Sequence, residues 1–201
     1  MNDRYQTIST TSEGFYKEKG SKFLAFAYPV ISEDQVKERL DELKKLHYNA
    51  RHHCYAFILK PQEGQEETYR ASDAGEPAHS AGDPILGQIR SYQLHDVLVV
   101  VVRYFGGTKL GVSGLINAYK TAAEDALINS SIVEKFIERT FTIEFDYAVT
   151  GNVMPIVDQH QVTIVDQIFA ETCQYHLSVR LSQFDTIISL FSELKHVKVT
   201  L

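Results

Sequence analysis

A glycine-rich stretch that follows a run of valines has the composition best suited to binding chemistry. It lies between Arg103 and Tyr119 and holds four glycines within nine residues: Gly106, Gly107, Gly111 and Gly114. Glycine lets a ligand or another backbone come close because it has no Cβ, and it adopts positive φ readily. The helix expected here adds free N–H groups and a positive dipole end, with Arg103 and Lys109 nearby. These features predict a site for an anion such as phosphate.

The spacing of these glycines differs from the two common phosphate-binding motifs. One motif, Gly-x-x-x-x-Gly-Lys-Ser/Thr, requires Lys-Ser/Thr after its last glycine, whereas Gly111 is followed by Val112 and Ser113. The other, Gly-x-Gly-x-x-Gly, is not present. A nucleotide site of either type is therefore not expected. Tight packing of a strand against a helix is the alternative reason for the glycines.

A second group of reactive side chains lies in segment 72–83, which is rich in Ala, Gly and Pro. It carries Asp73, Glu76 and His79, and His52 precedes it in the chain. These four side chains could act as general acids or bases, or could hold a metal. Carboxylates in such a segment also accept hydrogen bonds from backbone N–H groups and order the loop, which is the preferred interpretation. No metal site or cofactor is predicted.

Hydrophobic patterns indicate the elements that would position these side chains. Residues 96–102 form a short apolar run rich in β-branched residues, as in a strand buried on both faces. A helix should follow, with Ser113 as its N-cap. Residues 51–59 are predicted to be a strand, on which Cys54 packs beside His52 rather than reacting. The polar and acidic residues 61–70 predict a loop.

The first part of the chain is predicted to form a hairpin and a surface helix. Aromatic residues over 13–28, with a turn at 19–21, favour two paired strands. Three lysines crowd this hairpin: Lys17, Lys19 and Lys22. Edge lysines that prevent sheet-to-sheet pairing explain them better than a binding role. Ser32 has the form of a helix N-cap, with the helix ending near His47.

The pattern changes near residue 138. Over 138–201, apolar residues alternate as in a strand, step as in a helix, and give the order β-α-β-β-α-β, which is the split βαβ arrangement of ferredoxin-like folds. We therefore predict two domains, 1–137 and 138–201, and the α+β class. The second domain has no cluster of Cys, His or Gly, which favours docking or positioning over catalysis.

Composition and charge fit a soluble globular protein of 201 residues with a net charge of −6. The first 137 residues carry a net charge of −2 and the last 64 carry −4, so nucleic acid, if bound, should bind a local patch on the first part. No stretch has the length of a membrane helix, and Cys54 and Cys173 are widely separated. These features predict a cytoplasmic protein that does not contact membranes.

Three segments together resemble the signature of the YigZ/Impact family: Arg103–Tyr119, Ala50–Ala56 and Ser72–Pro84. The resemblance implies a first domain similar to the second domain of ribosomal protein S5 and a second domain similar to small domains of elongation factor G. It also implies translational control, which eukaryotic members exert by binding a protein that activates a stress kinase. The chain departs from the family pattern at Ala74 and at His79-Ser80.

Three functions follow as hypotheses, and the first is preferred. The first is a non-enzymatic regulator that binds RNA or the ribosome, with Tyr104, Phe105 or Tyr119 stacking on a base. Its phosphate contacts would be the side chains and loop amides of Arg51, Arg70, Arg103, Lys109, Gly106, Gly107, Gly111, Ser113 and Gly114. The second is an enzyme acting on a phosphorylated or acyl small molecule. The third is a module that docks a regulatory protein. The oligomeric state stays open.

Overall fold

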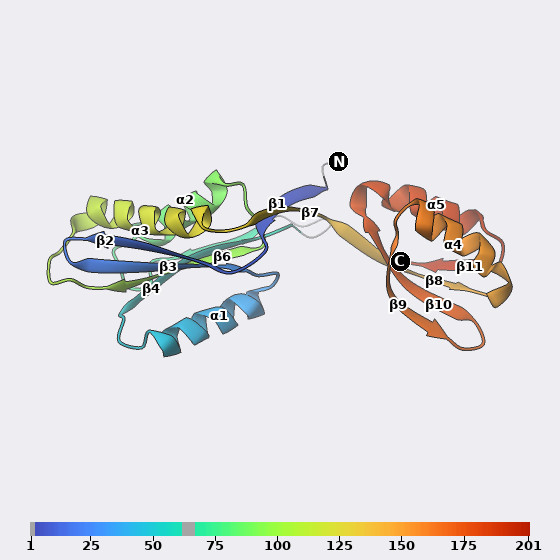
Figure 1. The fold of residues 1–201 in the computed structure, drawn as a ribbon, viewed down its shortest axis with the longest axis horizontal. Coiled ribbons are helices and arrows are strands. Elements are labelled where there is room, and N and C mark those ends of the chain that lie inside the picture. The colour runs from blue at the N-terminus through green and yellow to red at the C-terminus, as the bar shows by residue number, and fades with distance from the viewer. Residues whose placement is uncertain (1–2, 62–66) are drawn as a thin grey trace. The chain divides into compact units, whose positions relative to one another are not determined.

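The computed structural model of the protein describes residues 3–61 and 67–201 (Figure 1). The chain divides into a larger unit, Tyr5–Lys135, and a smaller unit that contains Phe136–Leu201 with Asp3 and Arg4. Within the described ranges, every helix falls short of the length and hydrophobicity that crossing a bilayer requires. Both units combine helices with antiparallel sheets, so the predicted α+β class is confirmed.

The larger unit is built around strand β6 (Val97–Tyr104), at the centre of a five-stranded sheet. The strand order is β2-β3-β6-β4-β5, and all neighbours are antiparallel. The flanking strands are β2 (Ser12–Glu18), β3 (Ser21–Pro29), β4 (His52–Leu59) and β5 (Thr68–Ser72). The apolar residues of β6 from Val97 to Val102 are fully buried, as the valine run predicts for a strand covered on both faces.

Helices cover both faces of this sheet (Figure 1). Helix α1 (Glu33–Leu46) packs on one face, and α2 (Gly82–Ser91) and α3 (Gly111–Ile128) pack on the other. The predicted cap of α1 is confirmed, because the Ser32 side chain accepts a hydrogen bond from the N–H of Gln35. This arrangement buries alternate residues of β6 under opposite helices.

Two expectations for the larger unit are wrong in detail. Helix α3 begins at Gly111 with Leu110 as N-cap, so Ser113 lies in its first turn and does not cap it. The loop predicted over 61–70 falls partly on residues 62–66, outside the described residues, but Thr68–Arg70 belong to β5. Polar residues fit this edge strand because Thr68, Tyr69 and Arg70 are exposed.

The smaller unit has the predicted β-α-β-β-α-β order. Its elements are β8 (Glu138–Phe145), α4 (Thr150–Gln159), β9 (Thr163–Phe169), β10 (Cys173–Arg180), α5 (Phe184–Glu193) and β11 (Val197–Thr200). The antiparallel sheet has the order β11-β8-β10-β9, which places the first and third strands at its centre. The helices pack with these strands in one core.

A separate two-stranded sheet pairs β1 (Arg4–Ile8) with β7 (Ile132–Phe136).

Candidate functional site

One end of the larger sheet brings together the segments that carry most of the predicted site residues. In the sheet register, Arg103 near the end of β6 lies between Phe23 of β3 and His52 of β4. The chain leaves β6 after Tyr104 and enters α3 at Gly111. The turn between β2 and β3, the start of β4 and the start of α3 therefore meet around residues 103–105.

Three adjoining hollows surround this end of β6, and each is lined by Phe105. The first hollow, of about 420 Å³, is lined by Asn49, Arg51, His52, Arg103, Tyr104 and Phe105. The second, of about 520 Å³, is lined by Phe15, Gly20, Lys22, Leu24, Tyr104 and Phe105. The third, of about 410 Å³, is lined by Glu76, Pro77, Arg103, Phe105, Lys109, Leu110, Gly111, Val112 and Leu115. Each lies within the size range of small-molecule pockets.

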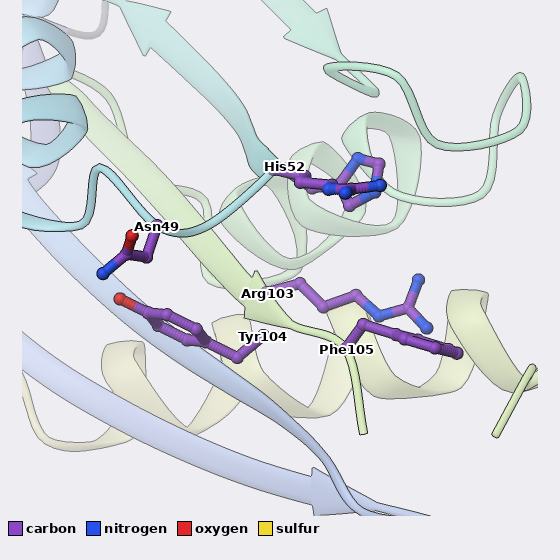
Figure 2. Close-up of a pocket in the computed structure, with 6 residues that line it drawn as sticks. Asn49, His52, Arg103, Tyr104 and Phe105 are labelled. Atoms are coloured by element: carbon purple, nitrogen blue, oxygen red, sulfur yellow. The ribbon is translucent and has the colours of Figure 1, made fainter. Parts of the chain in front are cut away.

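The side chains of the first hollow point in two directions. Figure 2 shows Tyr104 directed toward Asn49, while Arg103 and Phe105 extend the opposite way. The Phe105 ring is 59% exposed, and the Arg103 guanidinium carbon lies 5.6 Å from its centroid. The Tyr104 hydroxyl is 2.9 Å from Nδ1 of His47, which fixes its ring at the wall of the hollow. Phe105 is thus the aromatic ring most available for stacking.

Arg103 is committed to a buried ion pair. Its Nη1 donates to Oε1 of Glu76 at 2.6 Å, and these side chains are only 7% and 5% exposed. The Tyr119 hydroxyl donates to the same oxygen at 2.8 Å. Burial raises the pKa of Tyr119, so it stays a neutral donor. The expected free phosphate contact at Arg103 and the expected stacking by Tyr119 are corrected accordingly, because Glu76 neutralises the first and the core encloses the second.

The glycine loop offers fewer free amides than the sequence predicts. The N–H of Gly106 donates to the Ser21 hydroxyl at 3.1 Å, and Gly106 packs directly on Gly20. Gly107 and Gly111 adopt positive φ of 89° and 71°, which glycine tolerates best. In the first turn of α3, the N–H groups of Gly111, Val112 and Ser113 have no intrahelical partner, whereas that of Gly114 starts the helical ladder at the carbonyl of Leu110. The amide-rich part of the site is therefore the start of α3.

Asp73 orders the loop before α2. Its Oδ1 accepts hydrogen bonds from the N–H groups of Ala81 and Gly82 at 2.9 and 2.8 Å, and its Oδ2 accepts from the N–H of His79 at 2.8 Å. Burial alone would raise the pKa of Asp73, but these backbone donors outweigh it and the pKa is lowered. This is the loop-ordering role that the sequence favours over acid–base chemistry.

Replacing Asp73 with asparagine should reduce stability most near neutral pH. The folded-state pKa of Asp73 lies below its unfolded value of about 4, so the carboxylate stabilises the fold above that value and loses this effect as pH falls through the folded-state pKa. We expect a deficit of about 1 kcal/mol at pH 7 that shrinks toward pH 3. Thermal unfolding of both proteins across this range measures it; a deficit that is independent of pH would contradict it.

The remaining acid–base candidates do not converge on one reacting centre. His79 is 82% exposed and pairs with Asp83 at 2.6 Å, which raises the pKa of His79. Nδ1 of His52 lies 3.1 Å from the carbonyl oxygen of Ala74. Within residues 3–61 and 67–201, no three His, Cys, Asp or Glu side chains are grouped to hold a metal. Burial raises the pKa of the Cys54 thiol to about 12, so it is not a nucleophile at neutral pH.

The structure places Arg70 away from the three hollows and adds Lys22 and Phe15 to their lining. Arg70 lies opposite Phe57 in the β4–β5 pair and contacts Glu33 at 3.6 Å, and it lines none of the three hollows. Lys22 and Phe15 line the second hollow, whereas the sequence favours edge protection as the role of the hairpin lysines. The missing information was the register of β3 on β6, which pairs Lys22 with Tyr104.

Comparison with known proteins agrees with the three sequence segments. Residues 19–127, which include every residue that lines the first and third hollows, match the Impact N-terminal domain. The chain belongs to the Impact family. An Impact family member from Haemophilus influenzae is 36% identical over 180 residues, which cover 88% of this chain and 84% of that protein.

One solved structure shares the fold of the Impact-family chain, and a second is similar in sequence. The crystal structure of a hypothetical protein, 22% identical, covers all of this chain and 98% of its own with a TM-score of 0.74, which shows a shared fold. The two-domain translational regulator Yih1 is 31% identical and covers 62% of this chain and 47% of its own. Its TM-score is 0.39, too low for a structural argument.

Proposed function

We propose that this Impact-family protein is a translation-associated regulator that binds single-stranded RNA at the β6 end of its larger sheet. The observation that carries the proposal is the gathering of three hollows, unpaired basic side chains and two exposed aromatic rings at that end. The link to translation rests on the family resemblance and on its relative Yih1, which is a translational regulator.

The charge at this end suits a phosphate backbone better than the acidic chain as a whole. Lys22, Arg51 and Lys109 each line a different hollow, and none forms an ion pair with another of the residues that the structure describes. Unpaired cations on separate rims attract a chain of phosphates without fixing its sequence. Such a surface follows a flexible strand more readily than a rigid duplex.

Exposed rings at the same end provide stacking. Phe15 and Phe105 are both about half exposed and both line the second hollow. Unpaired bases stack on such rings, and each stacked base contributes about 1–3 kcal/mol. The combination of basic rims with half-exposed rings is characteristic of single-stranded nucleic acid binding. The acid–base groups nearby are engaged in holding the loop and the ion pair, which favours binding over catalysis.

Binding of a short single-stranded RNA at several salt concentrations tests the proposal. We expect the Lys22→Ala/Lys109→Ala variant to flatten the slope of log affinity against log salt by about 1.4, because each lost phosphate contact removes about 0.7 on a single strand. Its matched control is Lys37→Ala/Lys120→Ala, which removes two exposed lysines outside the hollows and should keep the wild-type slope. No detectable binding by the wild-type protein at low salt would refute the proposal.

A further inference from the structure

The third hollow has an unusual floor for an anion site. Most of its lining is apolar, from Pro77, Phe105, Leu110, Val112 and Leu115. Its polar side chains are the Glu76 carboxylate, the Arg103 guanidinium and Lys109. A carboxylate at the floor repels a phosphate, and this repulsion is strong where water is scarce. A neutral group that donates hydrogen bonds fits the floor better than an anion does.

The hydrogen bonds at this floor are incomplete. Oε1 of Glu76 accepts from Arg103 Nη1 and from the Tyr119 hydroxyl, whereas Oε2 accepts from none of the other residues that the structure describes. Nε of Arg103 is buried and also has no partner among them. A carboxylate has about four acceptor positions, so Oε2 can accept a hydrogen bond from a ligand. Nε of Arg103 is a buried donor of the kind that is normally paired. The side chains that carry the spare acceptor and the spare donor are joined by an ion pair, and both line the hollow.

We propose that the third hollow receives one unpaired nucleobase of the bound RNA, with an N–H on its Watson–Crick edge donating to Oε2 of Glu76. This inference rests on the proposed RNA binding and names the contact within it. The adjoining acceptor on the base faces the Arg103 guanidinium, and the ring lies against Phe105 and Leu110. Lys109 and the first N–H groups of α3 stay at the rim, where they meet the phosphates.

Edge contacts of this kind select strandedness rather than sequence. Each of the four RNA bases carries an N–H donor beside an acceptor on its Watson–Crick edge, so all four satisfy the same pair of protein groups. In a duplex those edges are already paired, and the hollow cannot reach them. The basic side chains at the rim alone would attract double-stranded RNA as well as single-stranded RNA. The contact at the floor gives a reason for the surface to prefer the single strand.

Modified RNA tests the edge contact on the unaltered protein. We compare binding of an oligouridine with the same oligomer built from N3-methyluridine, which keeps every phosphate and each ring but lacks the N3–H donor. We expect the methylated oligomer to bind about tenfold or more weakly, as for the loss of a hydrogen bond to a charged group. Equal affinities would overturn this inference while leaving RNA binding intact. Absence of binding by both oligomers would instead remove the proposed function itself.

A variant identifies the acceptor. In Glu76→Gln, Arg103 and the Tyr119 hydroxyl retain the amide oxygen as their acceptor, so the NH2 group takes the place of Oε2. Because NH2 cannot accept from the base, the preference for the unmethylated oligomer should fall to near unity. Thermal unfolding establishes whether the variant is folded, and if it is not, the wild-type comparison still decides. Full discrimination by folded Glu76→Gln protein would exclude Glu76 as the acceptor. Phe105→Leu is the control, because it should weaken both oligomers by a similar factor through lost stacking.

Discussion

Replacing Gly106 with alanine is expected to destabilise the larger unit by at least about 3 kcal/mol. An ideal Cβ on Gly106 would lie 1.9 Å from the carbonyl carbon of Gly20 and 2.1 Å from the amide nitrogen of Ser21. Both atoms belong to the backbone of the β2–β3 turn, so no side-chain rotation relieves the clash. The hydrogen bond from the Gly106 N–H to the Ser21 hydroxyl would be lost with it.

Urea unfolding of the wild-type and variant proteins measures this effect. The matched control is Gly87→Ala, because Gly87 lies within α2 and an added Cβ meets no atom within 4 Å. Alanine is the better helix former, so this control should gain about 0.5–1 kcal/mol. A Gly106→Ala protein whose stability lies within about 1 kcal/mol of the wild type would contradict the close approach of the two turns.

Removing the Arg103 guanidinium is expected to lower the free energy of unfolding by about 3–5 kcal/mol. Arg103→Met retains much of the side-chain volume. Among the residues that the structure describes, it leaves the buried Glu76 carboxylate with only the Tyr119 hydroxyl as a partner. A buried charge without a partner destabilises the folded state strongly, whereas replacing both members of a buried ion pair with apolar residues often leaves stability unchanged. The double variant Arg103→Met/Glu76→Met should therefore be more stable than Arg103→Met alone.

Denaturant unfolding of the wild type, both single variants and the double variant completes this cycle. Arg70→Met provides the control, because Arg70 forms an exposed ion pair with Glu33 at 3.6 Å. Exposed pairs contribute little, so this change should stay within about 1 kcal/mol. Additive effects of the two substitutions at the buried pair would show that Arg103 and Glu76 do not depend on each other.

Local sequence patterns predicted most of the elements because those patterns report burial directly. The valine run of β6, the cap at Ser32 and the alternation after residue 138 each depend on neighbours in the chain. Strand β5 was missed because an exposed edge strand has no apolar run to mark it. Ser113 fits the composition of a cap, yet the N-cap of α3 is Leu110, three residues earlier.

The site was less predictable because its key contacts join distant parts of the chain. The sequence marks Glu76 as an acid–base candidate and Arg103 as a phosphate contact. Their ion pair joins residues 27 positions apart, and no local pattern reports it. The contact of Gly106 with Gly20 depends equally on the register of β3 against β6. The ion pair with Glu76 neutralises the positive charge of Arg103. The positive charge around the hollows therefore comes from Lys22, Arg51 and Lys109.

The central position of β6 has a consequence for ligand recognition. This strand is hydrogen-bonded on both sides and covered by helices on both faces. We therefore expect it to be among the last parts of the unit to unfold locally. Arg103 lies near the end of β6 and Phe105 directly follows it, so both backbone positions should be as rigid as the strand. In the proposed complex a ligand would meet a preorganised floor, and the entropy lost on association would fall on the RNA strand rather than on the protein.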